Sequence, residues 1–257
     1  MFSIRLRNSK IIAGAVLLMT MVLYHQHVVA QFVHTSHDAR SGSMGGVFLL
    51  DSTRRIGLDY RRDFMLAELA DKRISIVLPT GQIGLASAEY NHHGDATYHE
   101  QQASFGYLIK TNGWLRVGVK VRWLNMGVSD GWYEPRHWIG TDALAMATWG
   151  YTSLLLTAGT RPWDKDSPWR AMAQVAFRPT AVWMAVVALE SDDRFRVRCG
   201  MEYVYDDLVF FRAGMATNPL LLGFGIGVKY GLMSFDLGAE LHSVLGVSPL
   251  CSIAICF

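Results

Sequence analysis

The stretch NHHGDATYH over residues 91–99 holds the side chains of this chain that most resemble a set of metal ligands. His92, His93 and His99, with Asp95 between them, offer imidazole nitrogens and a carboxylate, which are common ligands of divalent metals. Their spacing matches no closed metal-site pattern, and the stretch contains a glycine. We therefore expect a solvent-exposed loop here, without a metal or any other cofactor.

His242 and Ser243 are adjacent and could suggest a general base beside a nucleophile. Neighbouring residues of a strand point to opposite faces, so these two side chains cannot pair in that way. No serine lies in a nucleophile elbow either. We expect no catalytic residue and no enzymatic activity.

The three cysteines, Cys199, Cys251 and Cys256, form neither an even set nor a metal-like spacing. Cys251 and Cys256 are five residues apart and would point to opposite faces of one strand, so they cannot bridge each other in that geometry. We interpret all three as packing residues. The net charge of +2 is too small to indicate binding to nucleic acid, and no basic tail or helix supports it.

The elements that would position these residues are strands, because polar and apolar residues alternate through the last third of the chain. In residues 194–205, RFRVRCGMEYVY, one parity is charged or glycine and the other is apolar or aromatic. Residues 220–230, LLLGFGIGVKY, repeat the pattern. Successive side chains of a strand face opposite ways, so each segment has one apolar face. Repeated segments of about ten residues, separated by turns, are typical of transmembrane β-barrels.

Period-2 runs bounded by turn residues predict fourteen strands. The connections after even-numbered strands are tight, whereas those after odd strands include the longest: 91–98, 126–138, 159–168 and 242–248. Since barrels of this kind have short periplasmic turns and longer outer loops, we predict an all-β, 14-stranded antiparallel transmembrane β-barrel with periplasmic termini. A soluble periplasmic β-sandwich is the alternative, but its strands would be shorter, about five or six residues. The predicted strands are 54–63, 71–79, 82–91, 98–110, 113–126, 138–150, 152–159, 168–177, 180–190, 193–205, 207–216, 220–230, 232–242 and 248–257.

The chain divides into three parts. Residues 1–30 have a basic start, an apolar run too short to span a bilayer and a plausible cleavage site, which predicts a secretory signal peptide. Residues 31–53 would precede a barrel over 54–257. This order predicts the outer membrane of a Gram-negative bacterium, with outer-membrane lipid as a partner. Aromatic residues, Trp123 at the outer end and Tyr203, Tyr205, Tyr230 and Phe257 at the periplasmic end, fit interfacial girdles.

Two stretches resemble a known family. HDARSGSMGG over residues 37–46 resembles the glycine-rich opening of PorV-like and FadL-like outer-membrane transport barrels, and FRAGMATNP over 211–219 with GFGIG over 223–227 is similar to a hairpin of the same group. The resemblance implies fourteen strands and an N-terminal hatch or plug, which here would be the short segment 31–53, tucked into the lumen. The chain departs from the family where an Asn-Pro-Ala segment is usual, because VFLLD over 47–51 runs almost directly into the first strand. This departure argues against a FadL-like gated ligand path.

The face opposite the apolar one would line the lumen, because charges facing lipid cost a few kcal/mol each. By this register the lumen carries more positive than negative charge. Two interpretations stay open: side chains that pair and close the lumen, or a passage that attracts anions. The predicted lumen-lining residues are Arg116, Lys120, Arg122, Arg194, Arg196, Arg198, Glu202, Arg212, Lys229, Asp236 and Glu240.

The resemblance points first to a non-enzymatic, PorV-like accessory or scaffold barrel linked to protein secretion or envelope assembly, with a secretion-system or surface protein as partner. The alternative is an outer-membrane channel or transporter for small solutes, anions among them. Ile253, Ile255 and Phe257 share one parity of the last strand and resemble the C-terminal signal read by the barrel-assembly machinery, which we expect as a partner during insertion.

Overall fold

The computed structural model of the protein describes residues 38–49, 53–81, 83–129, 134–165, 168–192 and 194–257. Fourteen strands form one closed antiparallel barrel in which each strand pairs with its neighbours in sequence and β1 pairs with β14. The predicted all-β, 14-stranded antiparallel barrel is thereby confirmed. The strands are β1 (Arg55–Arg62), β2 (Ala70–Thr80), β3 (Gly84–Gly94), β4 (Tyr98–Lys110), β5 (Leu115–Val128), β6 (Arg136–Trp149), β7 (Thr152–Thr160), β8 (Trp169–Phe177), β9 (Trp183–Ser191), β10 (Phe195–Tyr205), β11 (Val209–Ala216), β12 (Leu221–Tyr230), β13 (Met233–His242) and β14 (Gly246–Cys256).

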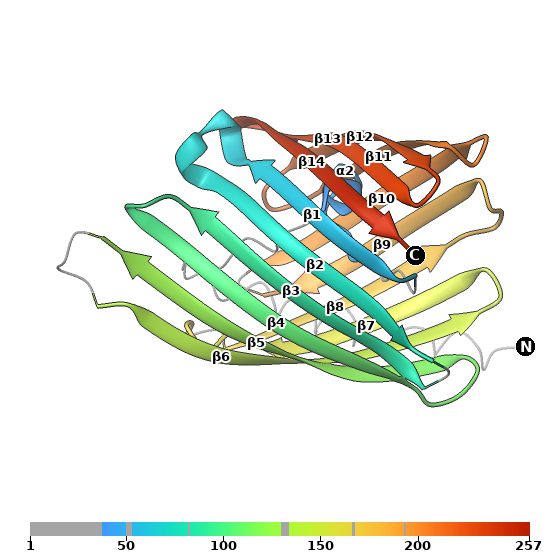
Figure 1. The fold of residues 1–257 in the computed structure, drawn as a ribbon, viewed down its shortest axis with the longest axis horizontal. Coiled ribbons are helices and arrows are strands. Elements are labelled where there is room, and N and C mark those ends of the chain that lie inside the picture. Colours follow the sequence, from blue (N-terminus) through green and yellow to red (C-terminus); the bar gives the residue numbers. More distant parts are fainter. Residues whose placement is uncertain (1–37, 50–52, 82, 130–133, 166–167, 193) are drawn as a thin grey trace, which may run out of the picture.

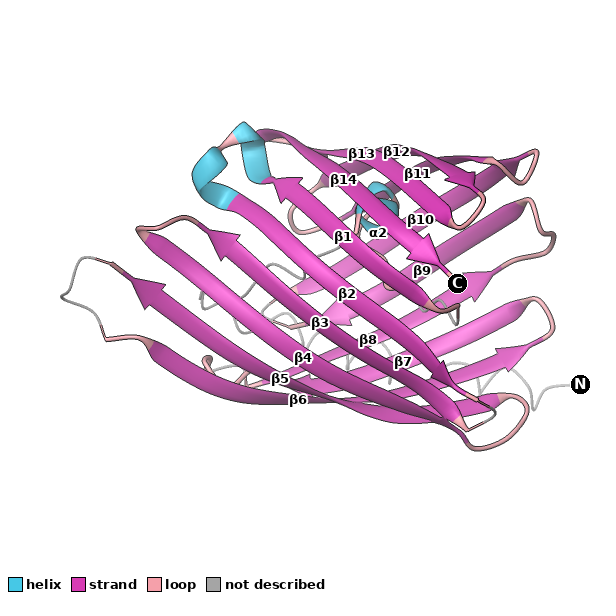
Figure 2. Ribbon diagram, viewed as in Figure 1, coloured by secondary structure: helices cyan, strands magenta, loops and turns pink. Residues whose placement is uncertain are grey.

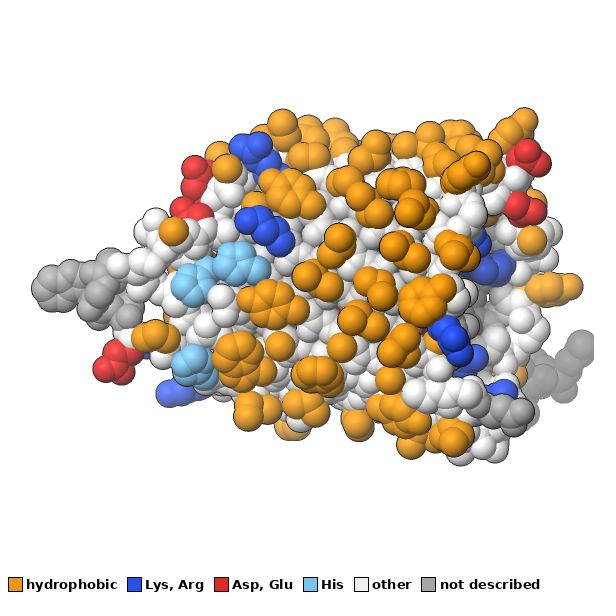
Figure 3. All heavy atoms as spheres, in the orientation of Figure 1, with side chains coloured by type: hydrophobic (Ala, Val, Ile, Leu, Met, Phe, Trp, Pro, Cys, Tyr) orange, Lys and Arg blue, Asp and Glu red, His pale blue; other side chains and the backbone are white. Residues whose placement is uncertain are grey.

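Alternation decides which side chains face outward. On β4, Phe105 is 70% exposed while its neighbour Ser104 is buried. The same contrast separates Met201 from Glu202 on β10. Figure 3 shows the result on one face of the molecule, where apolar side chains cover a broad central band and charged side chains gather toward the two ends. An apolar band of this kind is what a lipid-embedded barrel presents.

The two ends of the barrel differ. At the terminus end, β1 begins and β14 finishes, and aromatic rings pair there on the outer surface. Trp114 stacks on Trp149, with ring centroids 5.8 Å apart, and Trp183 packs at a tilt against Tyr203, with centroids 4.7 Å apart. At the opposite end, called here the loop end, the connection between β1 and β2 forms two 3-10 turns, η1 (Asp63–Met65) and η2 (Ala67–Leu69) (Figure 2).

Two connections predicted as long loops at the loop end are shorter. The predicted connection 91–98 is mostly strand, because β3 continues to Gly94 and β4 begins at Tyr98. The predicted connection 242–248 is reduced to residues 243–245, because His242 pairs with Gly246 at the ends of β13 and β14. In both places, strand pairing includes residues that do not alternate clearly between polar and apolar.

The segment before the barrel lies inside it. The short helix α2 (Ala39–Ser43) contacts β1 and β11–β14 and is seen within the barrel in Figure 1. Residues 38–49, called the plug from here on, follow the inner wall as far as β8. The predicted signal peptide, residues 31–37 and residues 50–52 lie outside the described residues. Among the described residues, no helix is both long and apolar enough to cross a membrane.

Candidate functional site: the plugged lumen

A groove made of glycines receives the plug. Gly200, Gly214 and Gly223 are direct partners across β10, β11 and β12, so their inward faces form a row without side chains. A Cβ on Gly214 would lie 2.1 Å from the carbonyl carbon of Met44. Only glycine allows another backbone to approach so closely. The strand face on which the sequence places glycines is therefore the surface on which the plug lies.

Hydrogen bonds tie the plug backbone to both sides of its path. Ala39 N–H donates to Ser252 Oγ at 2.7 Å on β14. On β8, Gln174 accepts from Phe48 N–H at 2.9 Å and donates to the Phe48 carbonyl at 2.6 Å. These bonds satisfy backbone groups that the plug, as a non-strand segment inside a barrel, cannot satisfy internally.

Charged groups fix the first turn of the plug. Asp38 caps α2 by accepting from Ser41 N–H at 2.7 Å, and it also accepts from Arg55 at 3.0 Å. Burial opposes ionisation of Asp38, but the guanidinium groups of Arg55 and Arg73, with the hydrogen bond from Ser41, hold its pKa below its usual range. The carboxylate of Asp38 is therefore charged and anchors the start of the plug at neutral pH.

The second half of the plug is apolar. Met44 and Val47 are completely buried and pack with Met184 and Val186 of β9. Burial of this apolar surface contributes to the free energy that holds the plug in place, in addition to the hydrogen bonds and ion pairs of the plug.

A cavity lies next to the plug, on the side that faces the terminus end. It has a volume of about 930 Å³, which is within the usual range for small-molecule sites. Phe48 and Leu49 of the plug line it together with apolar wall residues such as Met184 and Phe210. Arg178 and Lys229 also line it. The cavity thus combines apolar surface with charges of both signs, among which basic side chains are in excess. The basic residues that line it are Arg40, Arg55, Arg178, Arg212 and Lys229, and the acidic ones are Glu202, Asp207 and Asp236.

Away from the plug, charged side chains pair along the inner wall. Glu89 on β3 accepts from Lys120 at 2.8 Å and pairs with Arg73 at 3.1 Å. Asp142 on β6 bridges Arg122, at 2.9 Å, and Arg170, at 2.8 Å. These pairs cross from strand to strand, so the inner wall carries a network rather than isolated charges.

The predicted lumen-lining residues fall into four groups. Lys229 is exposed to the cavity just described. Arg194 is not on a strand: it lies exposed in the turn before β10, because β10 begins at Phe195. Arg116 and Lys120 are half-buried on β5. The remaining predicted residues are buried within the barrel: Arg122, Arg196, Arg198, Glu202, Arg212, Asp236 and Glu240.

The predicted set of lumen charges is incomplete. Sequence reasoning missed cations such as Arg73 and Arg170, and it missed carboxylates that pair with the basic side chains of the lumen. Asp142 on β6 and Glu89 on β3 are examples, since each binds two basic side chains. Further carboxylates that are buried or nearly so in the barrel are Asp59, Asp71, Glu100 and Glu190.

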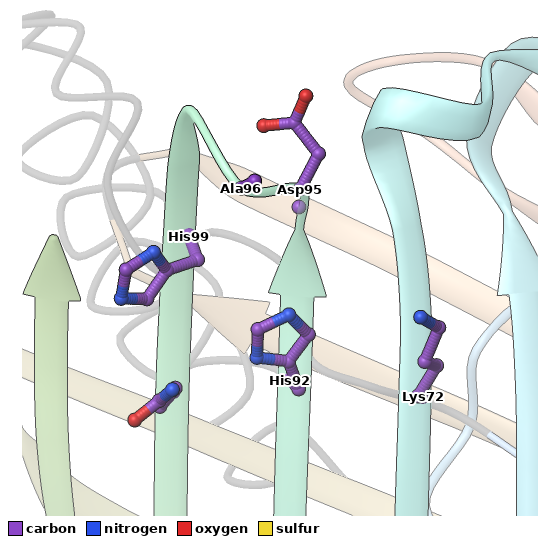
Figure 4. Close-up of a pocket in the computed structure, with 7 residues that line it drawn as sticks. Lys72, His92, Asp95, Ala96 and His99 are labelled. Carbon is purple, nitrogen blue, oxygen red and sulfur yellow. The ribbon is translucent and has the colours of Figure 1, made fainter. Parts of the chain in front are cut away.

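The histidine stretch is not a loop, contrary to the prediction. His92 and His93 lie on β3 and His99 lies on β4. The rings of His92 and His99 stack on the outer face with centroids 6.0 Å apart, beside Lys72 (Figure 4). His93 has the opposite parity, is buried and places Nδ1 3.0 Å from Asp71 Oδ1.

The other candidates for chemistry stay separate. His242 Nδ1 accepts from the N–H groups of Val244 and Leu245 at 3.1 Å, which makes it part of the β13–β14 turn. The three cysteines are free and half-buried.

No family model matches this chain, and no curated protein matches it. Among solved structures, the chain is similar to the toluene transporter TbuX of Ralstonia pickettii, with 11% identity, 88% of this chain and 100% of that chain covered, and a TM-score of 0.64. It is also similar to the CymD monoaromatic hydrocarbon channel, with 11% identity, 86% and 97% coverage, and a TM-score of 0.62. At this identity the likeness concerns the fold, which is that of outer-membrane transport barrels. By their names, both of these structures are transport proteins.

Proposed function

We propose that this protein is an outer-membrane channel or transporter for small solutes, and that its plug controls passage through the lumen. The observation that carries the proposal is the cavity of about 930 Å³ whose inner boundary includes Phe48 and Leu49 of the plug. A solute that enters this cavity meets the plug before it can go further. The alternative of an accessory barrel for secretion has no comparable support in the geometry.

The fold supports the same choice. The two similar structures are a toluene transporter and a monoaromatic hydrocarbon channel. We place the terminus end and its cavity toward the periplasm and the loop end toward the outside, because barrels of this kind have short periplasmic turns and longer outer loops. The apolar band on the outer surface matches a position in the outer membrane.

The lining of the cavity favours solutes with an apolar body and a negatively charged group. Met184 and Phe210 offer apolar contact, and Arg178 and Lys229 offer positive charge. A small aromatic carboxylate such as benzoate has both properties. A bare hydrocarbon would leave the excess positive charge of the lining without a complementary group, and a sugar would leave the apolar surface uncovered.

The test displaces the plug without touching a charge. Gly214→Ala places a methyl group where the plug backbone lies, so the plug has to move. Gly113→Ala is the matched control, since nothing lies within 4 Å of a Cβ there. Planar-bilayer recordings should give severalfold higher conductance for Gly214→Ala than for the wild type or the control. Equal conductance in all three proteins would contradict control by the plug.

The solute class is tested by uptake into proteoliposomes. Benzoate should enter faster than glucose. Lys229→Ser should reduce benzoate entry, whereas Lys110→Ser, at the end of β4 and outside the cavity, should not. Equal entry of benzoate and glucose would contradict the proposed solute class. The role of the plug is tested separately, by the conductance measurement.

A further inference from the structure

Three buried side chains meet at the loop end of the lumen: Asp63, Asp71 and His93. One ligand atom from each, two carboxylate oxygens and one imidazole nitrogen, all lie within 4.8 Å of one another. Asp63 is completely buried, and Asp71 and His93 are 3% and 5% exposed. A divalent metal ion binds between convergent groups of these types.

The barrel wall fixes most of this cluster. Asp71 on β2 and His93 on β3 are direct cross-strand partners, and His93 is in turn the direct partner of Glu100 on β4. Three residues of ligand type therefore form a continuous inward-facing row over three paired strands. Asp63 comes from the β1–β2 connection and reaches the row from the loop end. Ligands held on paired strands keep their geometry better than ligands on loops.

We propose that Asp63, Asp71 and His93 bind one divalent transition-metal ion of the zinc class. The set contains oxygen and nitrogen but no sulfur, which favours Zn²⁺ and its neighbours Co²⁺ and Ni²⁺ over Cu⁺. The imidazole disfavours Ca²⁺ and Mg²⁺, which prefer oxygen ligands only. Three protein ligands leave a fourth tetrahedral position, which water or Glu100 can occupy.

The surrounding charges fit a bound cation. Arg61 Nε donates to Asp63 Oδ1 at 2.5 Å, and Arg61 Nη2 pairs with Glu240 at 3.0 Å. A carboxylate has two oxygens, so Asp63 can accept from Arg61 with one and bind the metal with the other. Partners of this kind orient the ligands of metal sites. Four carboxylates, those of Asp63, Asp71, Glu100 and Glu240, thus surround Arg61 and His93, and a metal ion would compensate this negative charge.

The metal would tie the connection between β1 and β2 to β3. Asp63 belongs to the connection that also packs on β14, where Phe64 N–H donates to Ser248 Oγ at 2.9 Å. Binding of the ion would hold this connection against β2 and β3. The site lies on the far side of the plug from the cavity, so it is separate from the proposed solute site.

The experiment uses the full protein, purified and folded in detergent, stripped with a chelator and titrated with Zn²⁺ by calorimetry. We expect one Zn²⁺ per chain. His93→Gln and Asp71→Asn should abolish this binding. The double variant His92→Ala, His99→Ala is the matched control, because those rings lie on the outer face of the same strands, and it should bind like the wild type.

Two results would overturn the proposal: a wild type that binds no stoichiometric Zn²⁺, or binding that disappears in the His92→Ala, His99→Ala variant and persists in His93→Gln. Folding of each variant is checked by its heat-modifiable migration. If the variants of the site do not fold, the absorption spectrum of Co²⁺ added to the wild type and to the control variant decides whether the site exists. Ligand-field bands in both proteins support the site, and their absence from the wild type contradicts it.

Discussion

Arg40 and Glu202 form a two-bonded ion pair that fastens the plug to β10, with Nη2 2.6 Å from Oε1 and Nε 2.8 Å from Oε2. Glu202 is shared, because Arg212 on β11 also donates to it at 2.7 Å. Arg212 in turn reaches Asp236 on β13 at 2.5 Å. One carboxylate therefore connects the plug to a chain of charges that crosses three strands of the wall.

Because Glu202 serves two guanidinium groups, its loss should cost more than the loss of Arg40. Glu202→Gln leaves Arg212 without one of its charged partners inside the barrel, and breaking such a buried pair costs about 3–5 kcal/mol. Arg40→Gln leaves the Glu202–Arg212 pair intact and should destabilise less. Urea unfolding in detergent micelles measures both. A larger loss for Arg40→Gln would show that Glu202 is not the shared anchor.

Acid should release the first turn of the plug. The pKa of Asp38 is held below its ordinary value of 3.8, so its ionised form stabilises the seated plug at higher pH. This stabilisation is fully present above the ordinary pKa, begins to weaken as the pH falls below that value, and is lost only as the pH falls through the lowered pKa of Asp38 in the seated plug. Asp38→Asn should conduct more than the wild type at neutral pH, and the difference should begin to shrink below about pH 4 and shrink further in stronger acid. A difference that persists unchanged in acid would mean that the charge of Asp38 is not what holds the plug.

A charge on the outer surface should be costly in the apolar band and tolerated at its edge. Phe105 and Gln101 have the same parity on β4 and lie four residues apart, Phe105 in the band and Gln101 toward the loop end. Phe105→Arg should cost about 2–4 kcal/mol and Gln101→Arg about 0–1 kcal/mol, as measured by unfolding in lipid vesicles. Similar costs at the two positions would argue that the band does not face lipid.

Removal of Phe257 should lower the amount of assembled barrel. Phe257 follows β14, its ring is exposed, and its N–H donates to the Arg54 carbonyl at 3.1 Å beside the start of β1. Deletion removes both the bond and the aromatic end that we propose the barrel-assembly machinery reads. The heat-modifiable fraction in isolated membranes measures assembly. Phe257→Tyr is the control and should assemble normally; normal assembly of the deletion would show that the residue is dispensable.

The strands were predictable because their signal is local. Alternation over a few residues marks both ends of β4 correctly, at Tyr98 and Lys110. Alternation does not mark the end of β3, because His92 and His93 are both polar. These two residues belong to the strand because they pair with β4. Pairing depends on a neighbouring strand, and a stretch that is polar on both faces gives no local sign of it.

The site was less predictable, for the same reason. The sequence shows that Arg122 and Lys120 share a parity, but their partners Asp142 and Glu89 follow from the register between strands. The glycines at 214 and 223 are visible as an empty face, yet nothing near them in the sequence indicates that the DARSGSMGG stretch, about 170 residues earlier, fills it. Contacts over such separations are set by the closed barrel as a whole.

The bond between Ala39 and Ser252 joins residues 213 positions apart. Asp38 also holds Arg55, 17 residues onward, at the start of the strand that must pair with β14. A plug that binds β14 before the wall is complete therefore shortens the chain segment that remains to be closed from 213 to 17 residues. By the (3/2)RT ln n dependence of loop closure, this lowers the entropic cost of bringing the first and last strands together by about 2 kcal/mol. The segment that lies in the lumen of the finished protein thus also favours the meeting of β1 and β14, the first and last strands of the barrel.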